Sequence, residues 1–201
     1  YENFNACKAE FEIRGFNVHP GEGKDTMINA SLVAIEINNC LPSMETPRGT
    51  EDYEGFYHLI SMQGEVGEAK LNYIVRDHDK NGFEERKKTL RLIEKNLNAK
   101  WGEGTVTLKI TDQYLNMKEI VEEHMHLIDH AKKACEAAGV APLILPIRGG
   151  TDGCQLSFKG LPCPNLGTGG HAFHGPYEHI SVEGMEKSVE LLLALIQEYT
   201  K

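Results

Sequence analysis

The sequence predicts an α/β chain of two segments, a βαββαβ domain over residues 1–115 and a piece of an α/β layer over residues 116–201. Three observations carry this prediction. Stretches in which every second residue is apolar, the period of a half-buried strand, recur through the first segment. Two longer stretches with helical spacing separate them. In the second segment the strand candidates become short and almost wholly apolar, as in buried parallel sheets.

The first strand is predicted over residues 6–14, where apolar and charged residues alternate without a fault. Glycines and a proline then break the pattern. A helix is expected to begin at a cap on Asp25 or Thr26 and to run to about residue 39. Its apolar stripe is expected to consist of Ile28, Leu32 and Ile35, with Val33 and Ile37 beside it. Residues 40–55, with prolines among charges, are predicted to form a long loop.

A β-hairpin follows, with predicted strands over residues 57–66 and 69–77 and a two-residue turn between them. A helix is predicted over about residues 80–99, and a fourth strand over residues 105–111. The helix carries apolar residues at helical spacing, namely Phe83, Leu90, Ile93 and Leu97. The order βαββαβ is that of a ferredoxin-like domain, an antiparallel four-stranded sheet with both helices on one face.

In the second segment we predict a helix over residues 119–139, short strands over residues 142–147 and 161–168, and a terminal helix over residues 182–197. About 85 residues are few for an independent α/β domain. This segment is therefore expected to complete a sheet whose other strands lie outside the chain. The first residue, a tyrosine rather than a methionine, also suggests a piece of something longer.

Composition excludes some classes of partner. Among 201 residues, 40 % are hydrophobic and 25 % are charged, which is ordinary for a globular protein. The net charge of −9 argues against binding to nucleic acid, which needs a basic surface. No apolar run approaches the ~20 residues that span a bilayer, so no membrane partner is expected. The 5 cysteines show no paired or zinc-finger spacing and favour a reducing, cytoplasmic compartment.

The most unusual stretch is residues 146–178, in which roughly a quarter of the residues are glycine against ~7 % in ordinary proteins. Glycines allow a backbone to approach a ligand closely. Loops that present Arg, Asp and His on such turns are frequently binding or catalytic sites. The alternative is an ordinary surface loop with incidental histidines, and composition does not decide between the two.

Two residues of this stretch are candidates for chemistry. Arg148 offers a planar fork suited to a carboxylate or phosphate, and a local ion pair with Asp152 is an equal alternative. His174 is a candidate metal ligand, although a zinc site needs three or four ligands. His171 is a conceivable second ligand, and Glu178 is expected to orient His174 or to cap the following helix.

In the first domain His19 lies between a strand and a helix, Asn29 interrupts an apolar stretch, and Arg76 ends the hairpin. Each has a plain surface interpretation, which the pattern alone favours. The cluster EEHMH at residues 122–126 resembles metal chemistry, but it lacks the HExxH spacing and is expected to face solvent on a helix.

The stretch IRGGTDGCQLSFKGLPCPNLGTGGHAFHGPYE resembles the C-terminal signature of the peptidase T family, bacterial tripeptide aminopeptidases of the two-zinc aminoacylase/peptidase superfamily. The blocks NVHPGEGKDTMINA, EGFYHLISMQGEV, YIVRDHD and DQYLNM extend the resemblance, in order, over essentially the whole chain. It implies that residues 1–115 are the ferredoxin-like lid or dimerisation domain. Residues 116–201 would be the C-terminal part of an α/β zinc-peptidase catalytic domain.

The resemblance also implies roles for five residues. His174 matches a ligand of one of two zinc ions, and Arg148 matches the residue that holds the C-terminal carboxylate of the substrate. His19 matches a catalytic histidine expected to stabilise the developing oxyanion, which in dimeric relatives lies in the active site of the partner subunit. Asn29 and Arg76 match positions that bind the peptide backbone and terminus.

The implied activity is zinc-dependent release of the N-terminal residue from tripeptides, with a small peptide as substrate and a homodimer through the lid. The remaining zinc ligands and the general base would belong to an N-terminal half that this chain lacks, so the chain alone is expected to be inactive. One alternative is a dimerisation or binding module without catalysis, since a fold does not fix a function. Another is a related dipeptidase, or an amidohydrolase of acylated amino acids.

Overall fold

The structure is a computed structural model that describes residues 1–200, and the chain divides into two compact units. Phe4–Asn116 and Arg148–Gly150 form one of them, which we call the sheet unit. Tyr1–Asn3, Met117–Ile147 and the residues from Thr151 onward form the other, which we call the helical unit. Each is described by itself.

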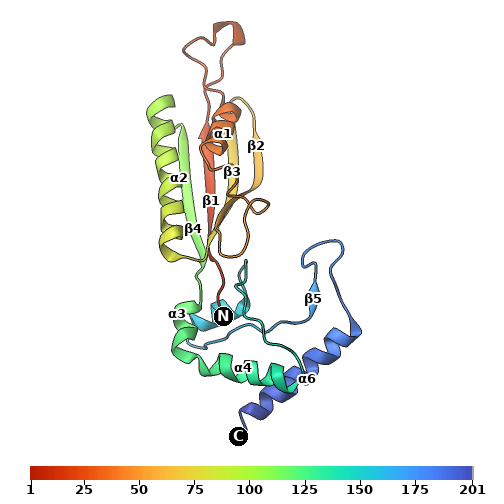
Figure 1. The fold of residues 1–201 in the computed structure, drawn as a ribbon. Helices are drawn as coiled ribbons and strands as arrows, with labels where there is room; N and C mark the ends of the chain where they lie inside the picture. Colours follow the sequence, from red (N-terminus) through yellow and green to blue (C-terminus); the bar gives the residue numbers. More distant parts are fainter. Residues whose placement is uncertain (201) are drawn as a thin grey trace. The chain divides into compact units, whose positions relative to one another are not determined.

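The sheet unit is a four-stranded antiparallel sheet with two helices on one face (Figure 1). The strand order is β2-β3-β1-β4, so the predicted βαββαβ topology is confirmed. The elements in chain order are β1 (Asn5–Arg14), α1 (Ala30–Asn39), β2 (Phe56–Gly64), β3 (Glu68–Asp77), α2 (Lys80–Trp101) and β4 (Val106–Tyr114). Residues 40–55 form the predicted loop, without a helix or strand.

The core of the sheet unit lies between the sheet and its two helices. Phe11 of β1 stands opposite Leu71 of β3 and Leu108 of β4, and it contacts the ring of Tyr73 edge to face at 6.2 Å. Burial of Tyr73 raises the pKa of its hydroxyl to about 12. Alternate strand residues face the helices, and the residues between them are mostly polar, which explains why period two was visible in the sequence.

The start and the buried side of α1 differ from the prediction. The helix begins at Ala30, because the Asn29 Oδ1 accepts a hydrogen bond from the Leu32 N–H at 3.3 Å and caps it. Asp25, a predicted cap, has a left-handed backbone with φ 57° instead. The side packed on the sheet consists of Ala30, Val33, Ala34 and Ile37. Leu32 and Ile35, expected on the apolar stripe, are 61 % and 46 % exposed.

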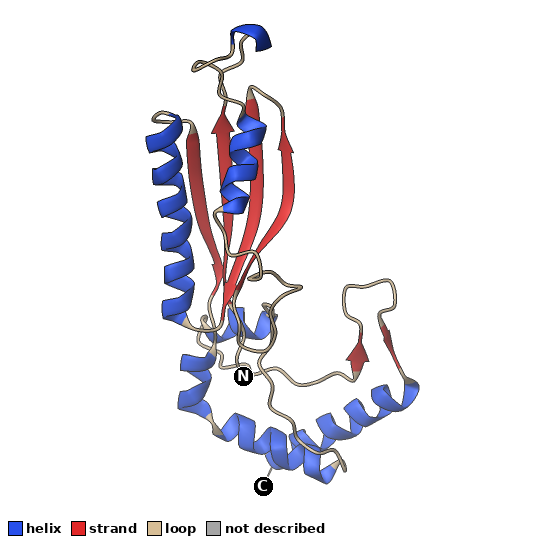
Figure 2. Ribbon diagram, turned by 45° about the horizontal axis from the view of Figure 1, so that its top comes forward, coloured by secondary structure: helices blue, strands red, loops and turns tan. Residues whose placement is uncertain are grey.

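The helical unit contains mostly short elements (Figure 2). They are α3 (Lys118–Val121), η2 (Glu122–His124), α4 (His126–Ala137), α5 (Asp152–Ser157), β5 (Gly170–His171), β6 (His179–Ile180) and α6 (Val182–Glu198). Helix α4 packs against α6. In place of the predicted single helix over residues 119–139, the structure has three pieces, α3, η2 and α4. Its predicted end is confirmed, since Gly139 has φ 71° and the Val140 N–H bonds the Cys135 carbonyl at 2.8 Å.

Two predicted strands do not form in the helical unit. In residues 142–147, the only bridge among the described residues is a parallel one between Ile147 and Asn3, and Leu143 is 78 % exposed. Residues 161–168 are also irregular. A strand needs a neighbour for its backbone hydrogen bonds, and the described part of the chain offers almost none here. The short helix α5 was missed; Thr151 caps it, with its Oγ1 accepting from the Cys154 N–H at 3.3 Å.

Among the residues that the structure describes, no helix is long and apolar enough to cross a membrane. All five cysteines are free thiols. Burial raises the pKa of the Cys7 thiol, in the core of the sheet unit, to about 12. Cys7 therefore behaves as a small apolar residue rather than as a nucleophile.

Candidate functional site

His174 lies in the exposed loop between β5 and β6. Its backbone is left-handed, with φ 60°, and Ala172 close by has φ 54°. Such conformations are costly for residues other than glycine and collect at functional sites. The Glu178 carboxylate accepts a hydrogen bond from the His174 backbone N–H at 2.8 Å. Glu178 thus fixes the backbone of His174, and neither ring nitrogen has a partner within the described residues.

No group of three or more His, Cys, Asp or Glu among residues 1–200 is arranged to hold a metal ion. His171, the conceivable second ligand, stacks its ring on that of His179 at 5.3 Å between centroids. The histidines of EEHMH do not form a metal-holding group either, and most of that cluster is exposed, as predicted. The described residues therefore do not fit a complete metal site. His174 offers one imidazole to such a site.

His19 lies beyond the C-terminal end of β1 and precedes a short 3₁₀ helix, η1 (Pro20–Glu22). Its Nδ1 accepts a hydrogen bond from the Gly21 N–H at 3.2 Å, and its side chain is exposed. Because Nδ1 is the acceptor, a neutral ring carries its hydrogen on Nε2. His19 therefore presents an N–H donor to solvent, which suits a hydrogen bond to a negatively charged oxygen of a ligand.

Asn29 and Arg76 differ in their surroundings. The Asn29 Oδ1 is engaged in the cap of α1, so its amide N–H₂ is the group left to meet a ligand. Arg76 is only 8 % exposed, so its plain surface interpretation is wrong. Its Nη1 donates to the Val75 carbonyl at 3.0 Å and its guanidinium lies over the Tyr114 ring at 5.1 Å. Burial lowers the pKa of Arg76, and no carboxylate of the described residues forms an ion pair with it.

The two terminal nitrogens of Arg148 donate hydrogen bonds to loop 40–55. Its Nη1 donates to the carbonyl oxygens of Asp52 at 2.8 Å and Glu54 at 2.9 Å. Its Nη2 donates to the Thr50 Oγ1 at 2.8 Å and to the Thr50 carbonyl at 3.3 Å. The guanidinium lies over the rings of Phe4 at 5.1 Å and Phe56 at 5.7 Å. All these groups are neutral, and within residues 1–200 no carboxylate pairs with Arg148, so its positive charge is not cancelled.

The structure brings Arg76 and Arg148 to one end of the sheet. Phe56, on which Arg148 stacks, stands directly opposite Arg76 in the pairing of β2 with β3. His19 and Asn29 lie at the other end, because both belong to the segment between the C-terminal end of β1 and α1. Figure 1 shows this segment beyond that end of the sheet. Strand β1 has 10 residues and so spans about 30 Å. Within the sheet unit the two pairs of residues therefore do not meet.

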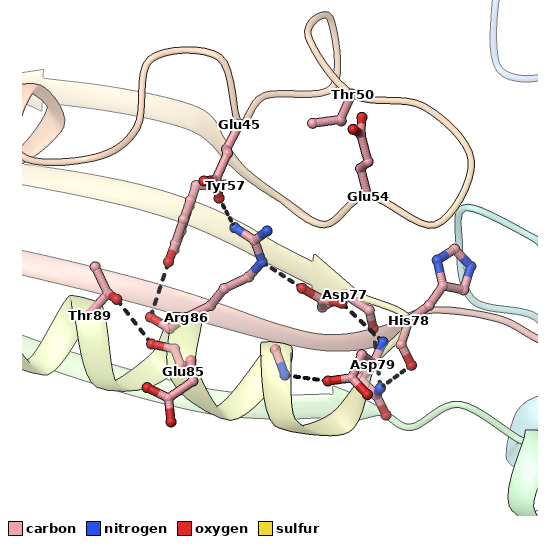
Figure 3. A network of polar contacts seen from close by, with 12 residues as sticks. Glu45, Thr50, Glu54, Tyr57, Asp77, His78, Asp79, Glu85, Arg86 and Thr89 are labelled. Atoms are coloured by element: carbon pink, nitrogen blue, oxygen red, sulfur yellow. Dashed lines mark hydrogen bonds and ion pairs between the residues drawn. The ribbon is translucent and has the colours of Figure 1, made fainter.

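Sequence reasoning missed a charged cluster at the end of the sheet that carries Arg76 and Arg148 (Figure 3). The Arg86 Nε donates to Asp77 at 2.8 Å, its Nη1 bonds Glu45, and its guanidinium lies over the Tyr57 ring at 5.0 Å. Burial opposes the charge on Arg86, but the bonds to Asp77 and Glu45 outweigh burial and raise its pKa. The only sequence signal was an arginine on the helix α2, and nothing in its spacing marks these partners.

Residues 1–105 match the family model described as the peptidase dimerisation domain. The peptidase T of Clostridium perfringens is 54 % identical over the whole chain, which covers 50 % of that protein. The chain spans about half the length of the curated relatives it matches.

Two solved structures share the fold. A tripeptidase from Staphylococcus aureus has a TM-score of 0.82 at 17 % identity, over 98 % of this chain and 52 % of that one. The YXEP protein of Bacillus subtilis, described as a dinuclear metal binding peptidase from the M20 family, has a TM-score of 0.64 at 15 % identity, over 99 % of this chain and 51 % of that one. At these identities the likeness shows the fold alone.

Proposed function

Because the chain belongs to the peptidase dimerisation domain family, we propose that it is part of a longer metal-dependent aminopeptidase that releases the N-terminal residue from tripeptides. Residues 1–115 are its lid and dimerisation domain, and residues 116–201 the C-terminal segment of its catalytic domain. The observation that carries the proposal is the identity of 54 % over the whole chain with a protein named peptidase T. The five free thiols of this chain favour a cytoplasmic enzyme.

In this proposal two zinc ions bind at the catalytic centre, and His174 is a ligand of one of them. The support is an exposed imidazole without a protein partner among the described residues, on a loop with left-handed backbone at two non-glycine residues. The remaining ligands come from outside this chain, since its described residues hold no metal-binding group. With His174 as one ligand, such a metal centre would supply a water molecule of lowered pKa and a polarised scissile carbonyl.

The sheet unit supplies the contacts with substrate. His19 donates from its Nε2 to the oxygen that becomes negatively charged as the carbonyl is attacked. Arg148 attracts the C-terminal carboxylate of the peptide, and the buried charge of Arg76 strengthens the field at that end of the sheet. The Asn29 amide binds the peptide backbone.

The distance between these residues supports a homodimer. His19 and Arg148 lie at opposite ends of a strand about 30 Å long, so one active site takes His19 from a partner subunit. The surface suited to the dimer is the edge of β2 beyond Tyr57, whose N–H bonds the Glu45 carbonyl, together with the outer side of α1. Four exposed apolar residues follow this surface, namely Leu32, Ile35, Ile60 and Met62.

The double substitution Leu32→Glu and Ile60→Glu is expected to convert the dimer into monomers, because it puts charges into an apolar contact. Light scattering after size-exclusion chromatography would report half the mass of the parent. Leu92→Glu is the matched control, since Leu92 is equally exposed but lies on α2. A double variant that stays dimeric would show that the subunits meet elsewhere. A monomer with full activity would remove the partner role of His19.

Arg148→Ala is expected to raise the KM of the whole enzyme for tripeptides with a free C-terminus by about 10- to 100-fold, since a charge-assisted contact is lost. The KM for tripeptides that end in an amide should change little. Steady-state kinetics on the two peptides make the comparison, and Arg14→Ala, an exposed arginine at the end of β1, is the control. Equal losses on both peptides would remove the carboxylate role of Arg148.

A second candidate function, a dimerisation module without catalysis, is favoured for the isolated 201-residue chain because its described residues cannot hold a metal. The two candidates differ in one respect. The module requires only the β2 edge and α1, whereas the peptidase requires His19, Arg148 and His174 as well. Measurable hydrolysis that is lost when Arg148 is changed separates them.

A further inference from the structure

Loop 40–55 joins α1 to β2 and is fastened by an arginine at each of two points. Arg86 of α2 bonds Glu45 near the start of the loop, and Arg148 bonds its far end at residues 50–54. Figure 3 shows Glu45, Thr50 and Glu54 on the loop, with Arg86 between Glu45 and Asp77. The loop carries no helix or strand, and these side-chain contacts add to its own backbone hydrogen bonds.

The Arg86 end is held by both side chain and backbone. The Glu45 carboxylate bonds Arg86, and the Glu45 carbonyl accepts from the Tyr57 N–H at 2.9 Å. Arg86 is fixed in turn by Asp77 and by the Tyr57 ring. A half-buried ion pair with several partners orders its neighbours more than an exposed ion pair does.

A chain of contacts runs from Glu45 to Arg148. Thr46 follows Glu45, and its carbonyl accepts from the Thr50 Oγ1 at 2.8 Å. The same Thr50 Oγ1 accepts from the Arg148 Nη2 at 2.8 Å, so this hydroxyl links the two ends. The turn depends on Gly49, because a Cβ there would lie 2.2 Å from the Met44 carbonyl oxygen.

The Arg148 end is shaped to receive a guanidinium. Asp52 has φ 43°, a left-handed conformation that Asp tolerates better than most residues, and its carbonyl oxygen meets the Arg148 Nη1. The Glu54 side chain accepts from the Glu51 N–H at 3.0 Å, which closes the loop beside the Glu54 carbonyl. All four terminal N–H groups of Arg148 meet loop oxygens. Within the described residues only its Nε–H and its uncancelled charge remain for a ligand.

We infer that loop 40–55 is the positioning element of Arg148, with Thr50 as the residue through which it acts and Arg86 as its anchor. The inference rests on the proposed function, in which Arg148 meets the C-terminal carboxylate of a peptide. The loop holds the terminal nitrogens and leaves the Nε edge for one carboxylate oxygen. Preference for peptides with a free C-terminus therefore depends on the loop that holds Arg148 in place.

The kinetic test uses Thr50→Val in the whole enzyme, which removes the linking hydroxyl and keeps the shape of the side chain. The KM for free tripeptides should rise about tenfold, with kcat within about twofold, because one hydrogen bond to a charged group is lost. The KM for amidated tripeptides should stay unchanged, and Thr50→Ser should restore the parent value. An unchanged KM for free tripeptides, or an equal rise for both peptides, would overturn the inference.

A second measurement does not depend on activity. Arg148→Ala should speed hydrogen exchange at the amides of Gly49 and Glu54, which bond the carbonyls of Thr46 and Glu51 inside the loop. Unchanged exchange at both amides would overturn the coupling of Arg148 to the loop. If exchange rises but Arg148→Ala affects free and amidated peptides equally, the coupling stands and the carboxylate role in the proposed function is what fails.

Discussion

His174→Ala in the whole peptidase is expected to remove one of two bound metal ions and to lower turnover by at least about a thousandfold. The imidazole of His174 has no protein partner among the described residues, and its left-handed backbone is held by Glu178. A ring kept free on a strained loop suits a ligand, and a missing ligand leaves the metal with too few donors. Elemental analysis of the purified variant, beside its rate on a tripeptide, measures both effects.

His179→Ala is the matched control for this variant. His179 lies in the neighbouring strand β6, and its Nδ1 contacts the Tyr177 carbonyl at 2.8 Å while its ring stacks on His171. Its loss should leave the metal content at two ions and cost little turnover. If His174→Ala retains both ions at full occupancy, His174 is not a ligand and its conformation has another cause.

His19→Ala is expected to lower kcat by about 10²- to 10³-fold, the usual effect of removing one donor to an oxyanion, with the metal content unchanged. The donor is Nε2, because the Gly21 N–H occupies Nδ1. KM should change less than kcat, since the oxygen becomes fully charged only as the reaction proceeds. Loss of metal in this variant would mean that His19 is a ligand instead.

Mixed dimers test from which subunit His19 acts. One subunit carries His19→Ala and the other carries Arg148→Ala, so a site that takes His19 from its partner is intact in one of the two positions. Such heterodimers should recover about half of the parent activity on free tripeptides. No recovery would show that His19 and Arg148 serve the same subunit, which a strand of about 30 Å between them makes hard to achieve.

The sequence was sufficient to predict the sheet unit because its signals are local. Alternation along β1 and β3 and helical spacing along α2 each reflect one face of one element, and the order of elements then follows. The predicted start of α1 was wrong because one side chain, that of Asn29, accepts a hydrogen bond from the Leu32 N–H and so sets where the helix begins. The resemblance to the peptidase T family is confirmed by a relative 54 % identical over the whole chain.

The predictions that failed depend on distant or absent neighbours. The apolar pattern of residues 142–147 predicted a buried strand. A strand forms only beside a partner, and among the described residues the one bridge to this stretch comes from Asn3. The contacts of Arg148 could not be predicted from the sequence either, since its partner Thr50 precedes it by 98 residues. Its site role and those of His19, Asn29, Arg76 and His174 remain predictions. They came from a resemblance, and contacts fixed by the tertiary fold leave no periodic trace in a sequence.

The measurement that tests the central claim most directly is the release of the N-terminal residue from a free tripeptide by the whole protein, before and after removal of metal. We expect rapid release that stops on chelation and returns with zinc, and no release by the isolated 201-residue chain. Hydrolysis by the whole protein that persists without metal, or by the isolated chain at the same rate, would contradict the account.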